Sequence, residues 1–263
     1  MNIDVAYVIS GLMVGLLVGL TGVGGGSLMT PLLTAIFGIS PSVAVGTDLA
    51  FAAITKGAGT IVHLLRKSVD WKIVRLMCLG SLPASLLTSV LLYSLDIHKA
   101  EKGSTVDVFI RYSIAVCVLL TAASLIFKQK IVAWQQASPT RQLHGTALTA
   151  TTIGAAAIIG FLVTVSSIGA GAIGATVLIM LYPRLSASEV AGTDIAYAVP
   201  LTAVAAGGHI LLGTINWGLL AALLLGSIPG ISVGSYLSRS VPERLLRGVL
   251  ATTLTAVAVK LVS

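Results

Sequence analysis

The fold is decided by residues 40–83, which read SPSVAVGTDLAFAAITKGAGTIVHLLRKSVDWKIVRLMCLGSLP. The pattern returns 146 positions later, at residues 186–229, which read SASEVAGTDIAYAVPLTAVAAGGHILLGTINWGLLAALLLGSIP. Both copies keep a Gly-Thr-Asp triplet, a histidine and a closing Gly-Ser-Leu-Pro or Gly-Ser-Ile-Pro. Apolar repeats that retain an Asp and a His are typical of a two-halved membrane transporter, whose site lies where the repeats meet.

The composition places the chain in lipid. Hydrophobic residues make up 56% of it and charged residues only 10%, and the mean hydropathy is +1.01, whereas about a quarter of the residues in soluble domains are charged. The net charge of +7 is therefore interpreted as a signal of membrane topology. We expect the lipid bilayer as a partner, and no nucleic acid.

Ten apolar segments predict an all-α polytopic membrane protein. They fall into two sets of five, at 4–20, 27–38, 42–64, 71–94 and 107–127, and at 144–165, 172–182, 187–211, 217–238 and 243–262. The second member of each set would reach only ~16–18 Å as a helix, about half of a ~30 Å hydrocarbon layer. Each set therefore predicts a broken hairpin with a half-helix, followed by three transmembrane helices.

Basic residues predict that the two sets have opposite orientations. Cytoplasmic loops collect Lys and Arg, and eleven of the 16 basic residues fall on one side if the first set begins outside. We therefore predict two inverted-topology repeats, 1–127 and 144–263, joined by a cytoplasmic linker at 128–143. The chain is then a multi-pass protein of the cytoplasmic membrane with both termini extracytoplasmic. The eleven residues are Arg66, Lys67, Lys72, Arg75, Lys128, Lys130, Arg141, Arg184, Arg239, Arg244 and Arg247.

Glycine-rich breaks precede both half-helices, at residues 22–26 and 167–171. Irregular backbone at membrane depth is tolerated where it lines a cavity, and a helix start offers free N–H groups with a partial positive charge. We expect the two starts to form an anion cradle near the midplane, although glycines also permit close helix packing. The substrate-binding candidates in the breaks are Gly24, Gly25, Gly26, Ser27, Gly169 and Gly171.

Polar residues share one face of the third segment in each set. A helix over 42–64 places Asp48, Lys56 and His63 within a sector of about 100°. The copy places Asp194, Thr202 and His209 in the same sector. Such a stripe should face the interior of the bundle.

Lys56 is the sharpest single candidate, because a lysine near the centre of a membrane helix costs roughly 2.5–3.5 kcal/mol. An anionic substrate can offset that cost, as can a structural ion pair with Asp48 or Asp194, or snorkelling to the interface. The two aspartates either carry protons, or cap half-helix N–H groups and pair with Lys56. Thr47 and Thr193 can add hydroxyl donors to the substrate site.

His63 and His209 are further proton-coupling candidates. The topology places them near the inner and outer ends of their helices, where they can exchange a proton with either side, but lone histidines are more often hydrogen-bonded core residues. We predict no metal, because no ligand spacing is present, and no cofactor. No nucleophile, base or carboxylate dyad has suitable spacing for an enzyme.

Four motifs carry a resemblance to a known family. They read GLLVGLTGVGGGS at 15–27, VGTDL at 45–49, VDW at 69–71 and GSLP at 80–83. These motifs resemble the TauE/SafE sulfite exporter family, and the resemblance extends over nearly the whole chain. It implies a secondary transporter of small sulfur-containing anions such as sulfite or organosulfonates.

The main hypothesis is alternating access to a midplane anion site, with possible coupling to protons. The alternatives are a passive anion channel that uses the same cradle, or a transporter of another small organic anion. The expected partners are a small anionic substrate and the bilayer, with the protein a monomer or a homodimer.

Overall fold

The computed structural model describes residues 5–21, 26–65, 67–95, 105–137, 144–237, 248, 252–256 and 260. These residues form helices and short connections, and no strand occurs among them. The nine helices are α1 (Val5–Thr21), α2 (Gly26–Ala35), α3 (Pro41–Leu65), α4 (Trp71–Ser94), α5 (Thr105–Ala137), α6 (Gly145–Ser166), α7 (Ala172–Leu181), α8 (Ala187–Leu211) and α9 (Trp217–Leu237).

Helix lengths agree with the predicted pattern. The predicted half-helices are α2 and α7, each of 10 residues, or ~15 Å at the usual rise. Five described helices are long and apolar enough to cross a membrane, namely α4, α5, α6, α8 and α9. Helix α3 is also 25 residues long, but it carries Asp48 and Lys56 and is not among these five.

One helix extends beyond its predicted segment, and one predicted segment lies mostly outside the described residues. Helix α5 continues past the predicted end at residue 127 to Ala137, so the first ten residues of the predicted linker are helical. The last predicted segment, 243–262, lies mostly outside the described residues, and only 248, 252–256 and 260 are described as helical.

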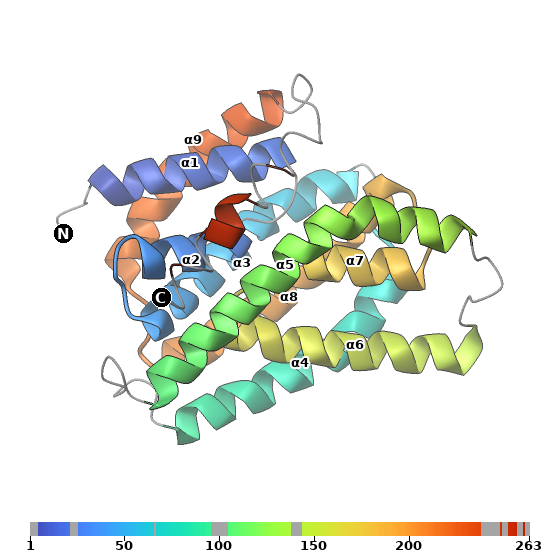
Figure 1. The fold of residues 1–263 in the computed structure, drawn as a ribbon, viewed down its shortest axis with the longest axis horizontal. Helices are drawn as coiled ribbons and strands as arrows, with labels where there is room; N and C mark the ends of the chain where they lie inside the picture. The colour runs from blue at the N-terminus through green and yellow to red at the C-terminus, as the bar shows by residue number, and fades with distance from the viewer. Residues whose placement is uncertain are drawn as a thin grey trace.

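The helices pair across the two halves of the chain (Figure 1). Helix α1 packs along α9, α4 packs along α6, and α3 packs against α8 between these pairs. Each first helix of a half therefore lies beside the fourth helix of the other half. The central pair, α3 and α8, carries the polar stripes predicted from the sequence.

Close packing of the outer pairs depends on glycine. A Cβ at Gly80 in α4 would overlap the carbonyl oxygen of Ile153 in α6, and a Cβ at Gly226 in α9 would overlap that of Val8 in α1. Gly80 and Gly226 are 146 positions apart, so both halves use the same glycine to bring two backbones together. Small residues at helix contacts are the usual means of close approach in lipid.

Matching turns connect the central helices to their followers. Lys67, between α3 and α4, has φ of 52°, and its counterpart Gly213, between α8 and α9, has φ of 67°. Helix α4 then starts at a cap in which Asp70 accepts hydrogen bonds from the N–H groups of Lys72 and Ile73. Its counterpart Asn216 accepts one from the N–H of Leu219 at 3.0 Å.

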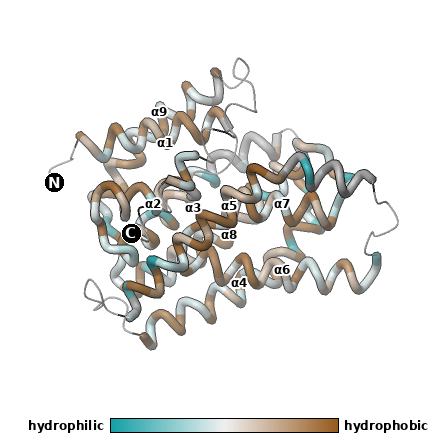
Figure 2. The backbone as a smooth tube through the Cα atoms, in the orientation of Figure 1, coloured by the Kyte–Doolittle hydropathy of each residue, from teal (hydrophilic) through white to brown (hydrophobic). Residues whose placement is uncertain are grey.

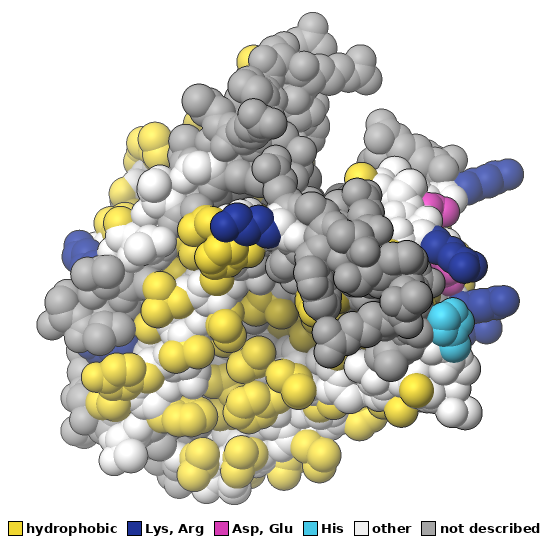
Figure 3. All heavy atoms as spheres, turned by 45° about the vertical axis from the view of Figure 1, so that its right-hand side comes forward, with side chains coloured by type: hydrophobic (Ala, Val, Ile, Leu, Met, Phe, Trp, Pro, Cys, Tyr) yellow, Lys and Arg dark blue, Asp and Glu magenta, His cyan; other side chains and the backbone are white. Residues whose placement is uncertain are grey.

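The outer surface is apolar. Brown residues run through the long helices in Figure 2, and a broad hydrophobic area covers one face in Figure 3, with Lys and Arg gathered towards its edges. The exposed aliphatic side chains of α4 include Leu87 at 72% and Leu79 at 63%. An apolar surface of this extent fits a lipid-facing protein.

Candidate functional site

Asp48 is fully buried in α3 and reaches the half-helix α2. Its Oδ2 accepts hydrogen bonds from the N–H of Thr30 at 3.2 Å and from the Thr30 hydroxyl at 2.6 Å. Its Oδ1 is buried without a hydrogen-bond partner among the described residues. The carboxylate is therefore held at the fifth residue of α2, one turn after Gly26.

The second break has a defined irregular backbone. Ser167 ends α6 in the left-handed conformation with φ of 61°, and Gly169 has φ of 126°, which favours glycine. The Gly169 carbonyl accepts from the N–H groups of Gly171 at 2.9 Å and Gly174 at 3.0 Å. In the described part of the chain, the N–H groups of Ala172 and Ile173 have no hydrogen-bond partner, so the start of α7 has two free donors.

Lys56 reaches this break from α3. Its ammonium donates a hydrogen bond to the carbonyl of Ala170, and only 6% of the residue is exposed. Its charge is opposite to that of the buried carboxylates of Asp48 and Asp194. Lys56 thus connects the central helix of the first half to the broken backbone of the second.

Asp194, in α8, lies against the first turn of α7. Its Oδ1 occupies the space that a Cβ at Gly174 would need, beside the ring of Tyr197. Both Asp194 Oδ1 and the Tyr197 hydroxyl are buried, and neither has a hydrogen-bond partner among the described residues. Each half-helix therefore has an aspartate near its start, although only Asp48 is hydrogen-bonded to it.

A polar cluster results from these contacts, and we name it the break cluster: Asp48, Lys56, Ser167, Ala170 and Asp194. The Ser167 side chain approaches Asp48, but its hydroxyl forms no well-aligned hydrogen bond to any described residue. The three ionisable side chains of the break cluster, Asp48, Lys56 and Asp194, are all buried. Such a cluster has unused acceptor oxygens as well as unused N–H donors at α7.

Thr47 and Thr193 contact the opposite half, outside the break cluster. The Thr47 hydroxyl oxygen accepts from the N–H of Asn216 at 3.1 Å, and that of Thr193 accepts from the N–H of Asp70 at 3.0 Å. Both pairs are related by the same shift of 146 positions. Each hydroxyl therefore joins one half to the other, beside the turn that precedes a long helix.

His209 is buried near the end of α8, with both ring nitrogens in hydrogen-bond contact. Nδ1 is 2.8 Å from the hydroxyl of Thr214, and Nε2 is 3.0 Å from the carbonyl oxygen of Thr164. Because a carbonyl only accepts, Nε2 carries the hydrogen in that contact. His63 lies in α3, and its side chain is outside the described residues.

Several predicted residues fall partly or wholly outside the description. Gly24 and Gly25 are not described, while Gly26 begins α2 and Ser27 follows it with an undescribed side chain. The predicted role of the first break therefore stays a prediction. Gly169 and Gly171 both lie in the second break, as predicted.

Three residues at the site were not among those predicted from the sequence: Thr30, Ser167 and Tyr197. Thr30 and Ser167 lie in or beside the predicted half-helix segments, where a hydroxyl has few other partners in lipid. Tyr197 stands one turn after Asp194 in an apolar helix, and a buried tyrosine hydroxyl usually needs a polar partner. All three residues could therefore have been predicted from the sequence as polar groups of the site.

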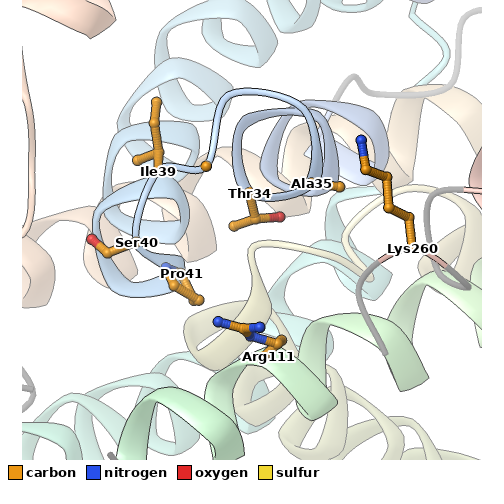
Figure 4. Close-up of a pocket in the computed structure, with 8 residues that line it drawn as sticks. Thr34, Ala35, Ile39, Ser40, Pro41, Arg111 and Lys260 are labelled. Carbon is orange, nitrogen blue, oxygen red and sulfur yellow. The ribbon is translucent and has the colours of Figure 1, made fainter. Parts of the chain in front are cut away.

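A surface cavity of ≈ 220 Å³ lies apart from the break cluster, at the connection from α2 to α3 (Figure 4). Arg111 and Lys260 line it together with Thr34 and Ser40. Arg111 also forms an ion pair with Asp107 at 3.1 Å. In Figure 4 Arg111 lies below Thr34, and Lys260 lies to the right of Ala35.

Comparisons with known proteins give a consistent result. The family model for sulfite exporter TauE/SafE matches residues 7–261. Three similar proteins of Bacillus subtilis (strain 168) are each named probable membrane transporter protein. YjnA is 36% identical over 260 residues, covering 98% of this chain and 100% of that protein. YdhB is 27% identical, covering 92% of this chain and 93% of that protein, and YunE is 25% identical, covering 92% and 91%. No solved structure matches the chain significantly.

Proposed function

We propose that this chain, which belongs to the sulfite exporter TauE/SafE family of membrane transporters, moves a small sulfur-containing anion by alternating access. The cargo class is sulfite or an organosulfonate, and the location is the cytoplasmic membrane. The observation that carries the proposal is at the start of α7, where the N–H groups of Ala172 and Ile173 have no partner among the described residues and Lys56 binds the carbonyl of Ala170, just before them in the chain. An oxyanion has several acceptor oxygens and matches such a group of donors.

The binding site includes the second break in this proposal. The N–H groups of Ala172 and Ile173 point from the positive end of α7, which favours negative charge. Lys56 adds a full positive charge next to Ala170. The predicted role of the first break, with Gly24, Gly25, Gly26 and Ser27, in binding the anion stays a prediction. Thr47 and Thr193 support the site by holding α3 and α8 to the turns of the opposite half.

Proton coupling follows from the position of the aspartates. Asp48 and Asp194 place negative charge at the same half-helix starts that would receive the anion, and like charges at short range repel each other. Protonation of an aspartate removes this repulsion, so a proton and the anion bind more favourably together than separately. Asp194 is the better candidate, because Thr30 donates two hydrogen bonds to Asp48 Oδ2, whereas Asp194 Oδ1 has no partner among the described residues. His63 and His209 are the candidates for proton exchange nearer the two surfaces.

The proposed architecture is a pair of inverted-topology repeats, 1–127 and 144–263, with the segment 128–143 on the cytoplasmic side and both termini outside. Reciprocal contacts support it: Thr47 with Asn216 repeats as Thr193 with Asp70. Rocking of one half against the other would expose the site alternately. The functional unit is a monomer or a homodimer.

Flux measurements in proteoliposomes test this proposal. We expect wild-type protein to take up potassium sulfite with saturation and counterflow, and faster when an inward proton gradient is imposed. Lys56→Ala should lose at least about tenfold in uptake at equal protein content, because removal of one buried charge partner typically costs more than 1.4 kcal/mol. Asp194→Asn should retain uptake but lose its response to the proton gradient.

Three results would contradict it. Unchanged sulfite and sulfoacetate flux in Lys56→Ala removes the role of that side chain. A response of Asp194→Asn to the proton gradient equal to that of the wild type removes the coupling role. Ohmic single-channel currents without counterflow would replace the carrier with a passive anion channel, and uptake confined to small carboxylates would change the cargo.

A further inference from the structure

The cavity at the connection from α2 to α3 is lined by two cationic side chains from distant parts of the chain (Figure 4). Arg111 belongs to α5 and Lys260 lies near the end of the sequence, and they line the cavity together with Thr34 and Ser40. Its volume of ≈ 220 Å³ is more than ten times the ~10–15 Å³ that one water needs. A hollow of this size with two cationic walls suits a small anionic group.

The ion pair with Asp107 uses only part of the Arg111 guanidinium. One terminal nitrogen, Nη2, donates to Asp107 Oδ2 at 3.1 Å, and the Arg111 side chain is 45% exposed. A guanidinium has five N–H donors in a planar fork, so donors remain for a second acceptor. Two cations and one carboxylate leave the described wall of the cavity with a net positive charge.

The second half of the chain shows which ligand the matching helix start takes. Ser186 and Glu189, at the start of α8, stand 146 positions after Ser40 and Val43, at the start of α3. Glu189 Oε2 accepts hydrogen bonds from the Ser186 N–H at 2.8 Å and from its hydroxyl at 2.7 Å.

The first half has no such carboxylate in this turn. Val43 stands where the second half has Glu189, and the Ser40 N–H has no acceptor among the described residues. The same turn therefore holds a carboxylate of its own chain in one half, whereas in the other it borders a cationic cavity.

We propose that this cavity binds one oxyanion group, which accepts hydrogen bonds from Arg111, Lys260 and the start of α3 as Glu189 does from the start of α8. Two sources supply such a group: the phosphate of an anionic lipid headgroup, or a small free oxyanion from solution. None of these residues belongs to the break cluster. The site is therefore additional to the one proposed for transport.

Thermal unfolding of the purified, delipidated full-length protein in detergent tests the binding. Midpoints are measured with increasing sodium phosphate or sodium sulfite against sodium chloride at equal ionic strength, and with phosphatidylglycerol against a diacylglycerol of the same chains. We expect a saturable rise of about 3 °C or more, because a ligand of the native state stabilises by mass action. A rise with phosphatidylglycerol alone assigns a lipid headgroup, and a rise with the inorganic anions assigns a free oxyanion.

A double variant locates the response in the cavity. Arg111→Gln with Lys260→Gln removes both cations and should lose the rise in midpoint. Arg75→Gln with Lys130→Gln is the matched control, since it makes the same change of charge at exposed residues that do not line the cavity. The control should respond like the wild type.

Val43→Glu tests the same site without removing a cation. It gives α3 the carboxylate that Glu189 gives α8, so the new side chain should cap the helix start and compete with the ligand. We expect a higher midpoint without ligand and no further rise when phosphate, sulfite or phosphatidylglycerol is added.

The absence of any shift in the wild type with all three ligands overturns the proposal. So does a shift in the double variant or in Val43→Glu that equals that of the wild type, because the ligand then binds elsewhere. Failure of Val43→Glu to fold also counts against it, since the matching turn of α8 accommodates the same glutamate. If the double variant does not fold, Val43→Glu decides. Loss of this inference leaves the transport proposal intact, because that proposal is tested by sulfite flux and by Lys56→Ala.

Discussion

At the residue scale, Thr30 and Thr176 provide a matched pair that tests the bond between Asp48 and α2. The Thr30 hydroxyl donates to the buried Asp48 carboxylate at 2.6 Å, whereas the Thr176 hydroxyl donates to the Ala172 carbonyl within α7 at 2.7 Å. Thr30→Val should lower the free energy of unfolding by about 1–3 kcal/mol, because it leaves a buried charged oxygen with one donor fewer.

Thermal unfolding in detergent measures this difference. Thr176→Val should change the midpoint little, since its hydroxyl only adds a second donor to a carbonyl of its own helix. Equal losses in the two variants would show that the hydroxyl contact to Asp48 contributes no special stability. The test separates this bond from the general effect of replacing threonine in a half-helix.

The sequence predicted which polar residues are buried, but it did not predict their hydrogen-bond partners. The periodicity placed Asp48 and Lys56 on the buried face of one helix, and both are buried in the structure. Their partners are Thr30, 18 positions away, and the Ala170 carbonyl, 114 positions away. Which partner each finds depends on how the half-helices dock, and no local pattern encodes that.

At the element scale, the packing of α4 on α6 depends on Gly80. A Cβ there would overlap the backbone of Ile153, so Gly80→Ala must push the two helices apart. We expect it to lower the free energy of unfolding by about 1–3 kcal/mol, the usual cost of overpacking. Gly226→Ala should do the same to the pair of α1 and α9.

Gly154 is the control for this prediction. It is the neighbour of Ile153 in α6, and a Cβ added to it meets no atom within 4 Å. Gly154→Ala should therefore be neutral or slightly stabilising, since alanine is the better helix former. A loss of stability in Gly154→Ala as large as that in Gly80→Ala would attribute the effect to helix propensity or lipid contact.

Helix boundaries were predictable where the sequence marks them chemically. Asp70 and Ser186 are side-chain caps that mark where α4 and α8 begin, and the predicted starts at 71 and 187 agree with these positions. The predicted apolar segment 107–127 coincides with the candidate membrane span in α5, although the helix itself does not end where lysines end the apolar run. Polar helix formers continue the helix to Ala137, just before Ser138 and Pro139, where proline disfavours further turns.

At the scale of the whole molecule, the repeat predicted which elements correspond, and the structure adds how they pair. Reciprocal contacts link each half to the other, from the hydrogen bonds of Thr47 and Thr193 beside the turns to the glycines at 80 and 226. Hydropathy alone could not reveal that α1 pairs with α9 rather than with its neighbour in sequence, because every long segment presents a similar apolar surface.

Opposite orientation of the two halves is a prediction that the matched tryptophans Trp71 and Trp217 can test. Both begin a long helix and are partly exposed, at 49% and 60%, so a cysteine at either position can react with a maleimide that does not cross membranes. The background is Cys78→Ser with Cys117→Ala, which removes the two native cysteines. In intact cells, Trp217→Cys should be labelled and Trp71→Cys should be labelled only after the membrane is permeabilised.

The physical basis of that expectation is the basic charge around the first site. Arg66, Lys67, Lys72 and Arg75 surround Trp71 in sequence, whereas no Lys or Arg lies between residues 185 and 238 around Trp217. Retention of positive charge in the cytoplasm should therefore place the two tryptophans on opposite sides. If both cysteines react from the same side, the repeats run parallel, and the starts of α2 and α7 could not face one midplane site from opposite directions. An anion bound there would then lack the alternating exposure on which transport by rocking of the halves depends.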